Sequence, residues 1–374
     1  MAMEIKIIDE ILKKSIISRG DTNRIKKLIQ KAENGQDITV AFLGGSITQG
    51  CNSSIYEKCY VELVYSWFKE KFNNVKVKHI NAGVGATGSL IGVHRVAKQV
   101  LDLNPDIVFI DFAVNDKEDY FYKVAYESLI RKILSSKSKP AVVEIFMIIE
   151  GGINMQEQQI AIGKNYNVPM ISYRDVVFDL LTKNEVKWEE ISTDEVHPND
   201  TGHKLLSELI INYIESVIDE YKNDNNIEID DSVLSKECVF GDRYINGIIE
   251  NYATTNVEKN IGFEKCEDGF QVFKNAWKFV GSKNVAGTLI AEVEGKNVSI
   301  LYKKSVAETA GKITVKINDE VKNIDTYFKD GWGDYSETEI LVEGNEVKKH
   351  RVEIEVQNQA RDKEVTILGF LVSK

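Results

Sequence analysis

The sequence predicts a two-domain protein, with an α/β domain built on a doubly wound parallel sheet followed by an all-β domain. The chain has 374 residues, which exceeds the usual size of a single hydrophobic core. Short apolar runs alternate with helical stretches through the first two-thirds, whereas period-two alternation fills the last third. The pattern changes at Lys222–Asn226, so we place the domains at residues 1–225 and 226–374.

In the first domain we expect five buried strands separated by helices. An amphipathic helix at Asn23–Lys31 leads into the first strand. The strands are apolar on both faces, as in a parallel sheet covered by helices: Ile38–Leu43, Val75–Ile80, Ile107–Phe112, Ala141–Ile148 and Val168–Ser172. The other helices are Tyr56–Lys71, Leu90–Leu101, Tyr122–Ser135, Met155–Asn165, Arg174–Thr182 and Thr201–Tyr221. This order implies a three-layer α/β sandwich.

The second domain reads as a β-sandwich or jelly roll, because short alternating strands recur with turn residues between them. The strands are Thr288–Val293, Val298–Tyr302, Lys312–Ile317, Glu337–Val342, Arg351–Val356 and Val365–Val372. Glu294–Asn297 and Asn318-Asp319 are expected to be turns. Trp277 lies in a strand-like stretch and is expected in the core.

Composition excludes several classes of protein. The formal net charge of -11 argues against a nucleic-acid partner, which would require clustered basic residues. No apolar run approaches the roughly 20 residues that span a bilayer, and the first residues lack the pattern of a secretory signal. The cysteines Cys51, Cys59, Cys238 and Cys266 show no CxxC spacing, so we expect free thiols. A cytoplasmic protein without a membrane partner is predicted.

Polar residues gather where predicted strands end, which is the edge at which open α/β sheets carry their sites. Gly44-Gly45-Ser46 follows the first strand, Asn81–Gly85 ends the second, and Ala113–Asp116 follows the third. Asp194 and His197 then stand three residues apart just before the last helix. A hydroxyl, backbone amides, an amide side chain and an Asp/His pair would therefore share one edge.

Acyl transfer requires this set of groups. A serine becomes a nucleophile when an imidazole removes its proton, and a carboxylate orients that imidazole. Ser46, His197 and Asp194 fit these roles. The developing oxyanion needs fixed hydrogen-bond donors, for which the backbone N–H groups of Ser46 and Gly85 and the side chain of Asn115 are candidates.

These four segments resemble the four sequence blocks of the SGNH (GDSL-like) hydrolases over roughly residues 20 to 220. The resemblance implies Ser46 as nucleophile, His197 as general base, Asp194 as its partner and Asn115 as oxyanion donor, with no metal and no organic cofactor. Two positions depart from the family pattern. Ala113 stands where the family has glycine, and the oxyanion amide aligns with either Gly85 or Ala86. An alanine fits there if its φ is negative.

Other interpretations of these residues remain open. Gly83–Gly88 is also a G-x-G-x-x-G sequence, with Asp102 about 20 residues further on, as in dinucleotide sites. However, Asp102 precedes the next strand instead of ending it, and this interpretation leaves Ser46 and His197 without a role. Ser46 alone is also compatible with a helix cap. His203 is expected to be structural and not a metal ligand.

The second domain narrows the choice of substrate. An SGNH domain joined to a jelly-roll domain resembles two-domain bacterial carbohydrate acetylesterases, which implies hydrolysis of acetyl esters on xylan- or mannan-derived oligosaccharides. Trp332 lies in the turn-rich stretch Lys329–Tyr335, which fits either an exposed ring that binds a sugar or partner, or a loop aromatic packed on its own domain. The resemblance implies that this ring covers the sugar. The alternatives are a thioesterase or lysophospholipase for longer acyl chains, and an inactive carbohydrate-binding protein, which only Ala113 favours.

Overall fold

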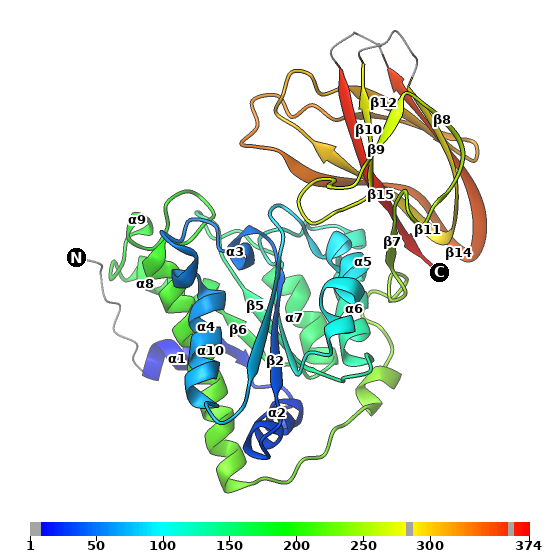
Figure 1. The fold of residues 1–374 in the computed structure, drawn as a ribbon. Coiled ribbons are helices and arrows are strands. Elements are labelled where there is room, and N and C mark those ends of the chain that lie inside the picture. The colour runs from blue at the N-terminus through cyan, green and yellow to red at the C-terminus, as the bar shows by residue number, and fades with distance from the viewer. Residues whose placement is uncertain (1–8, 282–286, 358–362) are drawn as a thin grey trace. The chain divides into compact units, whose positions relative to one another are not determined.

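The chain folds into an α/β unit followed by an all-β unit, as the sequence predicts (Figure 1). The computed structural model describes residues 9–281, 287–357 and 363–374. By internal contacts the first unit extends to Asp242 and the second contains Arg243–Lys374. Residues 226–242 therefore group with the α/β unit in the structure, and the division at residue 225 stays a prediction.

A six-stranded sheet in the order β1-β6-β5-β4-β2-β3 forms the centre of the first unit. All five predicted strands are present and pair in parallel. The sheet is mixed instead of wholly parallel, because β1 adds an antiparallel edge next to β6. That strand has three residues, which is too short for a periodic signal. The strands are β1 (Ile16–Ser18), β2 (Ile38–Gly44), β3 (Val77–Gly83), β4 (Ile107–Asp111), β5 (Ala141–Phe146) and β6 (Met170–Ser172).

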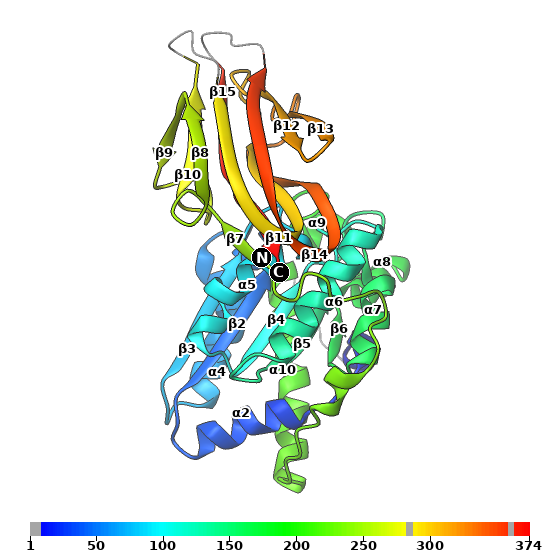
Figure 2. The same cartoon turned by 90° about the vertical axis from the view of Figure 1, so that its right-hand side faces the viewer.

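Helices cover both faces of this sheet (Figures 1 and 2). On one face, apolar side chains of α2 (Asn23–Glu33), α4 (Tyr60–Lys71), α8 (Tyr173–Thr182) and α10 (Asp200–Asn223) join those of the strands in one buried cluster. The other face carries α5 (Ser89–Gln99), α6 (Tyr120–Leu134) and α7 (Gln156–Asn165). The short helices are α1 (Asp9–Ser15), α3 (Ser46–Gln49), α9 (Trp188–Ile191), η1 (Tyr56–Lys58), η2 (Leu101–Leu103) and η3 (Ser232–Ser235).

One predicted helix, Tyr56–Lys71, is divided in the structure into η1 and α4. Cys59 between them has extended backbone, with φ -68° and ψ 152°. The loop from the end of α3 to Cys59 therefore stands apart from the regular helix that follows it.

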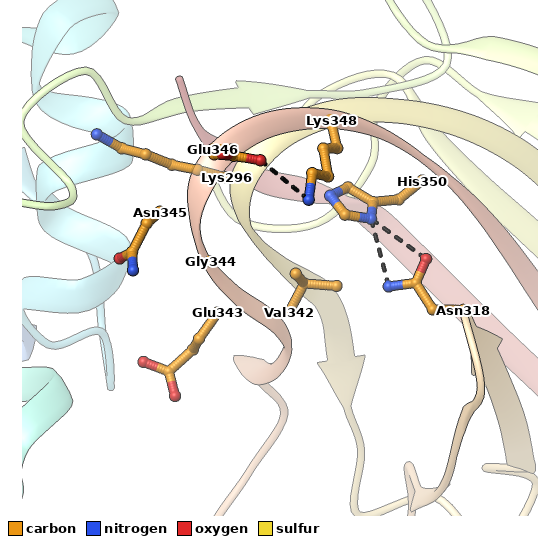
Figure 3. A pocket seen from close by; sticks show the side chains of 9 residues that line it. All are labelled: Lys296, Asn318, Val342, Glu343, Gly344, Asn345, Glu346, Lys348 and His350. Atoms are coloured by element: carbon orange, nitrogen blue, oxygen red, sulfur yellow. Dashed lines mark hydrogen bonds and ion pairs between the residues drawn. The ribbon is translucent and has the colours of Figure 1, made fainter.

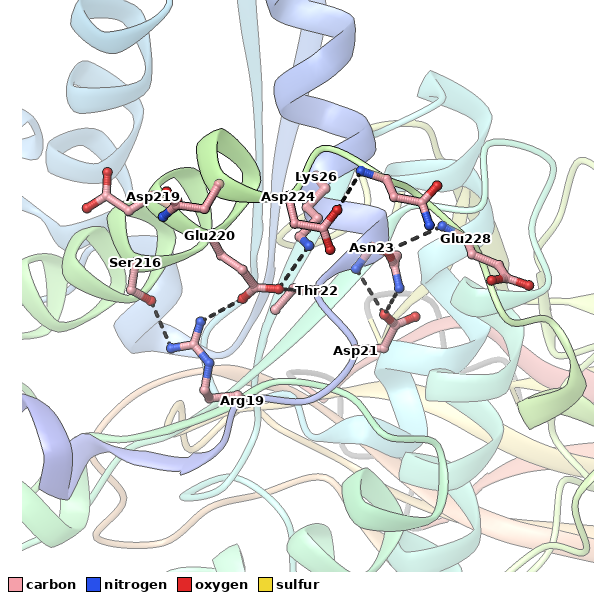
Figure 4. A network of polar contacts seen from close by, with 12 residues as sticks. Arg19, Asp21, Thr22, Asn23, Lys26, Ser216, Asp219, Glu220, Asp224 and Glu228 are labelled. Carbon is pink, nitrogen blue, oxygen red and sulfur yellow. Dashed lines mark hydrogen bonds and ion pairs between the residues drawn. The ribbon is translucent and has the colours of Figure 1, made fainter.

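A polar network ties the start of the first unit to α10 (Figure 4). The Glu220 carboxylate accepts hydrogen bonds from Arg19 at 3.0 Å and Thr22 at 2.9 Å, and pairs with the buried Lys26 at 2.9 Å. Partial burial raises the pKa of Glu220, but these hydrogen bonds outweigh it and lower the pKa overall. The network joins α2 to α10 through an ionised carboxylate.

The second unit is an antiparallel sheet whose main path runs β13-β12-β14-β11-β15-β10-β9, with β7 paired to β15 and β8 to β11. Side chains of β10 and β12, which are distant in this order, share one buried cluster, so the sheet folds around its own core. Trp277 is 1% exposed in that core, as predicted. The strands are β7 (Ile248–Glu250), β8 (Asn256–Ile261), β9 (Phe263–Cys266), β10 (Ala276–Val280), β11 (Thr288–Lys304), β12 (Lys312–Ile317), β13 (Glu320–Asp325), β14 (Tyr335–Gln357) and β15 (Glu364–Ser373).

The predicted turn at Glu294–Asn297 is wrong, because β11 continues through it and joins two predicted strands into one. Gly295 pairs with Lys348 but Asn297 pairs with Glu343, so four residues of β14 bulge out opposite Lys296. This bulge borders a polar pocket of about 420 Å³ (Figure 3). By contrast, the predicted turn Asn318-Asp319 does connect β12 to β13.

Candidate active site

The carboxyl ends of β2, β3 and β4 stop level with one another, because Gly44 pairs with both Gly83 and Asp111. Two close approaches explain the glycines before Ser46. A Cβ on Gly44 would lie 2.1 Å from the Thr48 hydroxyl, and one on Gly45 would lie 2.1 Å from the Asn115 Oδ1. Side chains at these positions would displace their neighbours, so the turn from β2 into α3 requires both glycines.

Ser46 is the first residue of α3, and its hydroxyl faces His197. The Ser46 Oγ lies 2.8 Å from the His197 Nε2, and the His197 Nδ1 lies 2.8 Å from the Asp194 Oδ2. The structure thus joins the three residues singled out in the sequence in one hydrogen-bonded chain. Nucleophile, base and orienting carboxylate have this connectivity in serine hydrolases.

Asp194 is held as a carboxylate by its own loop. The backbone N–H groups of Val196 and His197 donate to its Oδ1 at 2.7 and 2.6 Å. Partial burial raises the pKa of Asp194, but the hydrogen bonds from the backbone and side chain of His197 outweigh it and lower the pKa to about 2. The group is therefore ionised at neutral pH and can stabilise an imidazolium.

Side chains that the sequence analysis did not single out fix the loop from Asp194 to His197. The Trp188 indole donates to the Asp194 carbonyl at 2.8 Å. The Ser192 hydroxyl lies 2.9 Å from the Asp194 carbonyl and 2.6 Å from that of His197. The Asn52 amide donates to the Asp194 Oδ2 at 2.8 Å. Nothing in the local sequence marks these residues, because each acts through a contact that exists only in the folded chain.

The three oxyanion candidates lie around α3. Among the described residues, the Ser46 N–H has no hydrogen-bond acceptor. The Asn115 side chain packs against Gly45, the residue before Ser46. The Gly85 N–H donates to the Gln49 Oε1 at 2.9 Å. The alternative, Ala86, has a φ of 60°, so the negative φ on which that alternative depended is not observed.

A buried carboxyl lies directly beneath this edge. Asp111, at the end of β4, accepts a hydrogen bond from the Thr48 hydroxyl at 3.1 Å, and Thr48 also bonds the Tyr60 hydroxyl at 2.8 Å. Burial raises the pKa of Asp111 to about 7, while the Thr48 hydrogen bond lowers it in part. A charged residue in the otherwise apolar run Ile107–Phe112 was a signal available in the sequence.

Three other polar residues considered in the sequence have their contacts outside the hydrogen-bonded chain of Ser46, His197 and Asp194. Asp116 accepts from the Ser89 N–H at 2.7 Å at the start of α5. His203 is fully buried and bridges the Tyr60 N–H and the Cys51 carbonyl, as expected of a structural histidine. Asp102, the acidic residue of the dinucleotide interpretation, forms an ion pair with Lys98 on the surface.

Trp332 lies in the second unit with 71% of its surface exposed. Its ring stacks on Tyr335 with centroids 5.2 Å apart and an interplanar angle of 27°. Phe328 packs edge-on against both rings, at 5.9 Å from Trp332 and 5.5 Å from Tyr335. The three rings form one aromatic cluster, in which Trp332 is exposed and Phe328 and Tyr335 are half-buried.

Neither a cluster of metal-ligand side chains nor a membrane-spanning helix is found in the part of the chain that the structure describes. Over residues 9–281, 287–357 and 363–374, no group of three or more His, Cys, Asp or Glu side chains could hold a metal ion. No helix within the same ranges is long and apolar enough to cross a bilayer. All four cysteines are free thiols.

The fold and the site define a carboxylic ester hydrolase, and comparison with known proteins agrees. Residues 42–205 match the sequence model of the GDSL-like Lipase/Acylhydrolase family, and the chain belongs to that family. No curated protein sequence matches it.

Two solved structures are similar over the whole chain. A two-domain esterase (CEX) active on acetylated mannans is 30% identical, with 97% of this chain and 98% of that chain covered and a TM-score of 0.90. The same esterase co-crystallized with mannopentaose gives 30% identity, the same coverage and a TM-score of 0.89.

Proposed function

We propose that this protein is a serine esterase that removes O-acetyl groups from mannan- or xylan-derived oligosaccharides through an acyl-serine intermediate. The observation that carries the proposal is the similarity to an esterase active on acetylated mannans, which covers 97% of this chain and 98% of that one. The similarity includes the β unit and is therefore more than a shared hydrolase fold.

In the first half of the reaction, the Ser46 Oγ attacks the acetyl carbonyl carbon. His197 accepts the serine proton at Nε2, which lies 2.8 Å from that oxygen, while the Asp194 carboxylate stabilises the imidazolium. The tetrahedral intermediate then expels the sugar oxygen, which takes the proton from Nε2. The products of this half are a deacetylated sugar hydroxyl and an acetyl ester on Ser46.

In the second half, water attacks the acetyl-serine and gives its proton to His197. The intermediate releases acetic acid, which loses its remaining proton to solvent and becomes acetate, and the other proton returns from His197 to the Ser46 oxygen. Serine, histidine and aspartate end in their starting states, and the net reaction consumes one water for each acetyl group.

The oxyanion that forms in both halves needs donors at the N-terminal end of α3. We assign the Ser46 N–H and the Asn115 side chain as the first two donors. The Gly85 N–H would be the third once the substrate oxygen displaces the Gln49 Oε1, which accepts its hydrogen bond at 2.9 Å.

We assign sugar binding to Trp332. Its exposed ring stacks on Tyr335 with the ring centroids 5.2 Å apart. Because this contact restricts the ring, little conformational entropy is lost when its apolar face binds a ligand. The C–H faces of a pyranose can stack on such a ring.

Acetate release from acetylated manno- and xylo-oligosaccharides tests the proposal, with Ser46→Ala and His197→Ala as variants. Both variants should lose activity by more than a thousandfold at an unchanged melting temperature. A series of nitrophenyl esters should show a preference for acetate over octanoate. Turnover that survives Ser46→Ala would overturn the mechanism, and a preference for octanoate would overturn the substrate class.

A further inference from the structure

The loop between α3 and α4 contributes a side chain to the carboxylate that pairs with His197. Asn52 donates its amide N–H to the Asp194 Oδ2 at 2.8 Å and also contacts the Thr193 hydroxyl. The same Oδ2 accepts the bond from the His197 Nδ1 at 2.8 Å. Asn52 and His197 therefore share one oxygen of the carboxylate.

The other donors to Asp194 come from its own loop. Val196 and His197 supply the backbone N–H groups on Oδ1, and His197 supplies the ring N–H on Oδ2. Among the described residues, Asn52 is the donor that reaches Asp194 from the segment that carries Ser46. Because 45% of the Asp194 side chain is exposed, water would compete for Oδ2 if the Asn52 amide were absent.

The loop that presents Asn52 is fixed on both sides. Before it, the Cys51 N–H donates to the Ser46 carbonyl at 3.0 Å, and His203 holds the Cys51 carbonyl at 3.1 Å. After it, the Ser54 N–H and hydroxyl both bond the Asp200 carboxylate at 2.7 Å. Asn52 is thus placed between Ser46 and the first turn of α10.

The backbone at Asn52 also favours asparagine. Its φ is 66°, in the left-handed region that asparagine and glycine adopt more readily than other residues. A β-branched residue would be strained in this conformation.

We propose that Asn52 is a positioning residue for the proposed serine mechanism, on which this inference rests. Its amide holds the Asp194 carboxylate in the plane of the His197 ring. The proton of the neutral imidazole then stays on Nδ1, and Nε2 stays directed at the Ser46 hydroxyl. Asn52 neither touches the acetyl group nor exchanges a proton.

Two substitutions distinguish the effect of the Asn52 amide from the effect of its backbone conformation. Asn52→Gly removes the side chain but accepts the positive φ, whereas Asn52→Asp keeps the shape and replaces the donor by an anionic acceptor facing Asp194. Asn184→Gly is the matched control, because Asn184 also has a positive φ, of 56°, and is exposed after α8.

For Asn52→Gly we expect kcat on nitrophenyl acetate to fall about tenfold at an unchanged KM, the effect of one lost hydrogen bond. The melting temperature should shift no more than in Asn184→Gly, whose kcat should equal that of the wild type. A kcat of Asn52→Gly within twofold of the wild type would overturn the positioning role.

For Asn52→Asp, the low-field NMR resonance of the His197 Nδ1 proton, assigned with His197→Ala, gives a readout that needs no substrate. An anionic acceptor in place of the amide donor should shift this resonance, because both groups face the Asp194 Oδ2 that accepts the Nδ1 proton. Asn184→Gly should leave the resonance in place. An unchanged resonance in Asn52→Asp would refute the contact, whereas a wild-type protein without esterase activity would refute the proposed function and leave this NMR comparison interpretable.

Discussion

Asp194→Asn is the substitution for which the structure gives the sharpest expectation. The Asp194 Oδ1 accepts two backbone N–H groups at 2.7 and 2.6 Å, and its Oδ2 accepts from His197 at 2.8 Å. If the asparagine oxygen keeps the backbone bonds, its NH₂ group faces the His197 Nδ1. The ring must then accept at Nδ1 and carry its proton on Nε2, directed at Ser46, so it cannot receive the serine proton.

In the opposite orientation, the asparagine NH₂ group would face the backbone N–H groups of Val196 and His197. The free-energy cost of this orientation follows from the hydrogen bonds that it breaks. It would leave both backbone donors unpaired, at about 1–3 kcal/mol each, whereas the first orientation costs the single hydrogen bond from the Asn52 amide to Oδ2. The orientation that disables the base should therefore prevail. In Ser-His-Asp triads the wrong tautomer lowers kcat about 10⁴-fold, or about 5.5 kcal/mol in barrier.

The assay is initial-rate hydrolysis of nitrophenyl acetate at neutral pH, with thermal unfolding measured alongside. Asp194→Asn should lose roughly 10³- to 10⁴-fold in kcat at an unchanged melting temperature. Asp179→Asn is the matched control: hydrogen bonds from Lys14 and Lys183 also lower the pKa of Asp179, but this residue lies in α8 and has no part in the proposed mechanism. If Asp194→Asn kept a tenth of wild-type kcat, the tautomer reasoning would be refuted.

Three further predictions concern stability and binding. Because the pKa of Asp111 is raised from 3.8 to about 7, the folded state holds an extra proton between these values, and stability falls as pH rises through them. Asp111→Asn should remove this loss, by about 4 kcal/mol at most, and a melting-temperature difference that is equal at pH 4 and pH 8 would contradict it. Glu127→Gln should lower the free energy of unfolding by about 2–5 kcal/mol, since the buried carboxylate accepts the N–H groups of residues 239–241, and denaturant unfolding measures this. Trp332→Ala should raise KM about tenfold for acetylated oligosaccharides but not for nitrophenyl acetate, and equal effects on both substrates would remove Trp332 from sugar binding.

The strands of the α/β unit could be predicted because a parallel strand covered on both faces is apolar along its whole length. The same signal fails for β1, which has three residues at an antiparallel edge. A different signal fails within β11. There Glu294–Asn297 has the composition of a turn, but the strand continues through it. There the pairing with β14 and β15 keeps the strand extended and accommodates the mismatch as a bulge.

The α/β and all-β classes could be predicted without the structure, as could the turn at the glycines before Ser46 and the pairing of Asp194 with His197. These features depend on hydrophobic periodicity and on turn residues, and both can be recognised within a few consecutive residues of the sequence. Two contacts became visible only in the folded chain: Asn52 donates to Asp194, 142 residues away, and the Gly85 N–H donates to the Gln49 side chain. Such contacts depend on how the loops close over the sheet edge, and a hydrogen bond between distant residues leaves no pattern in either segment.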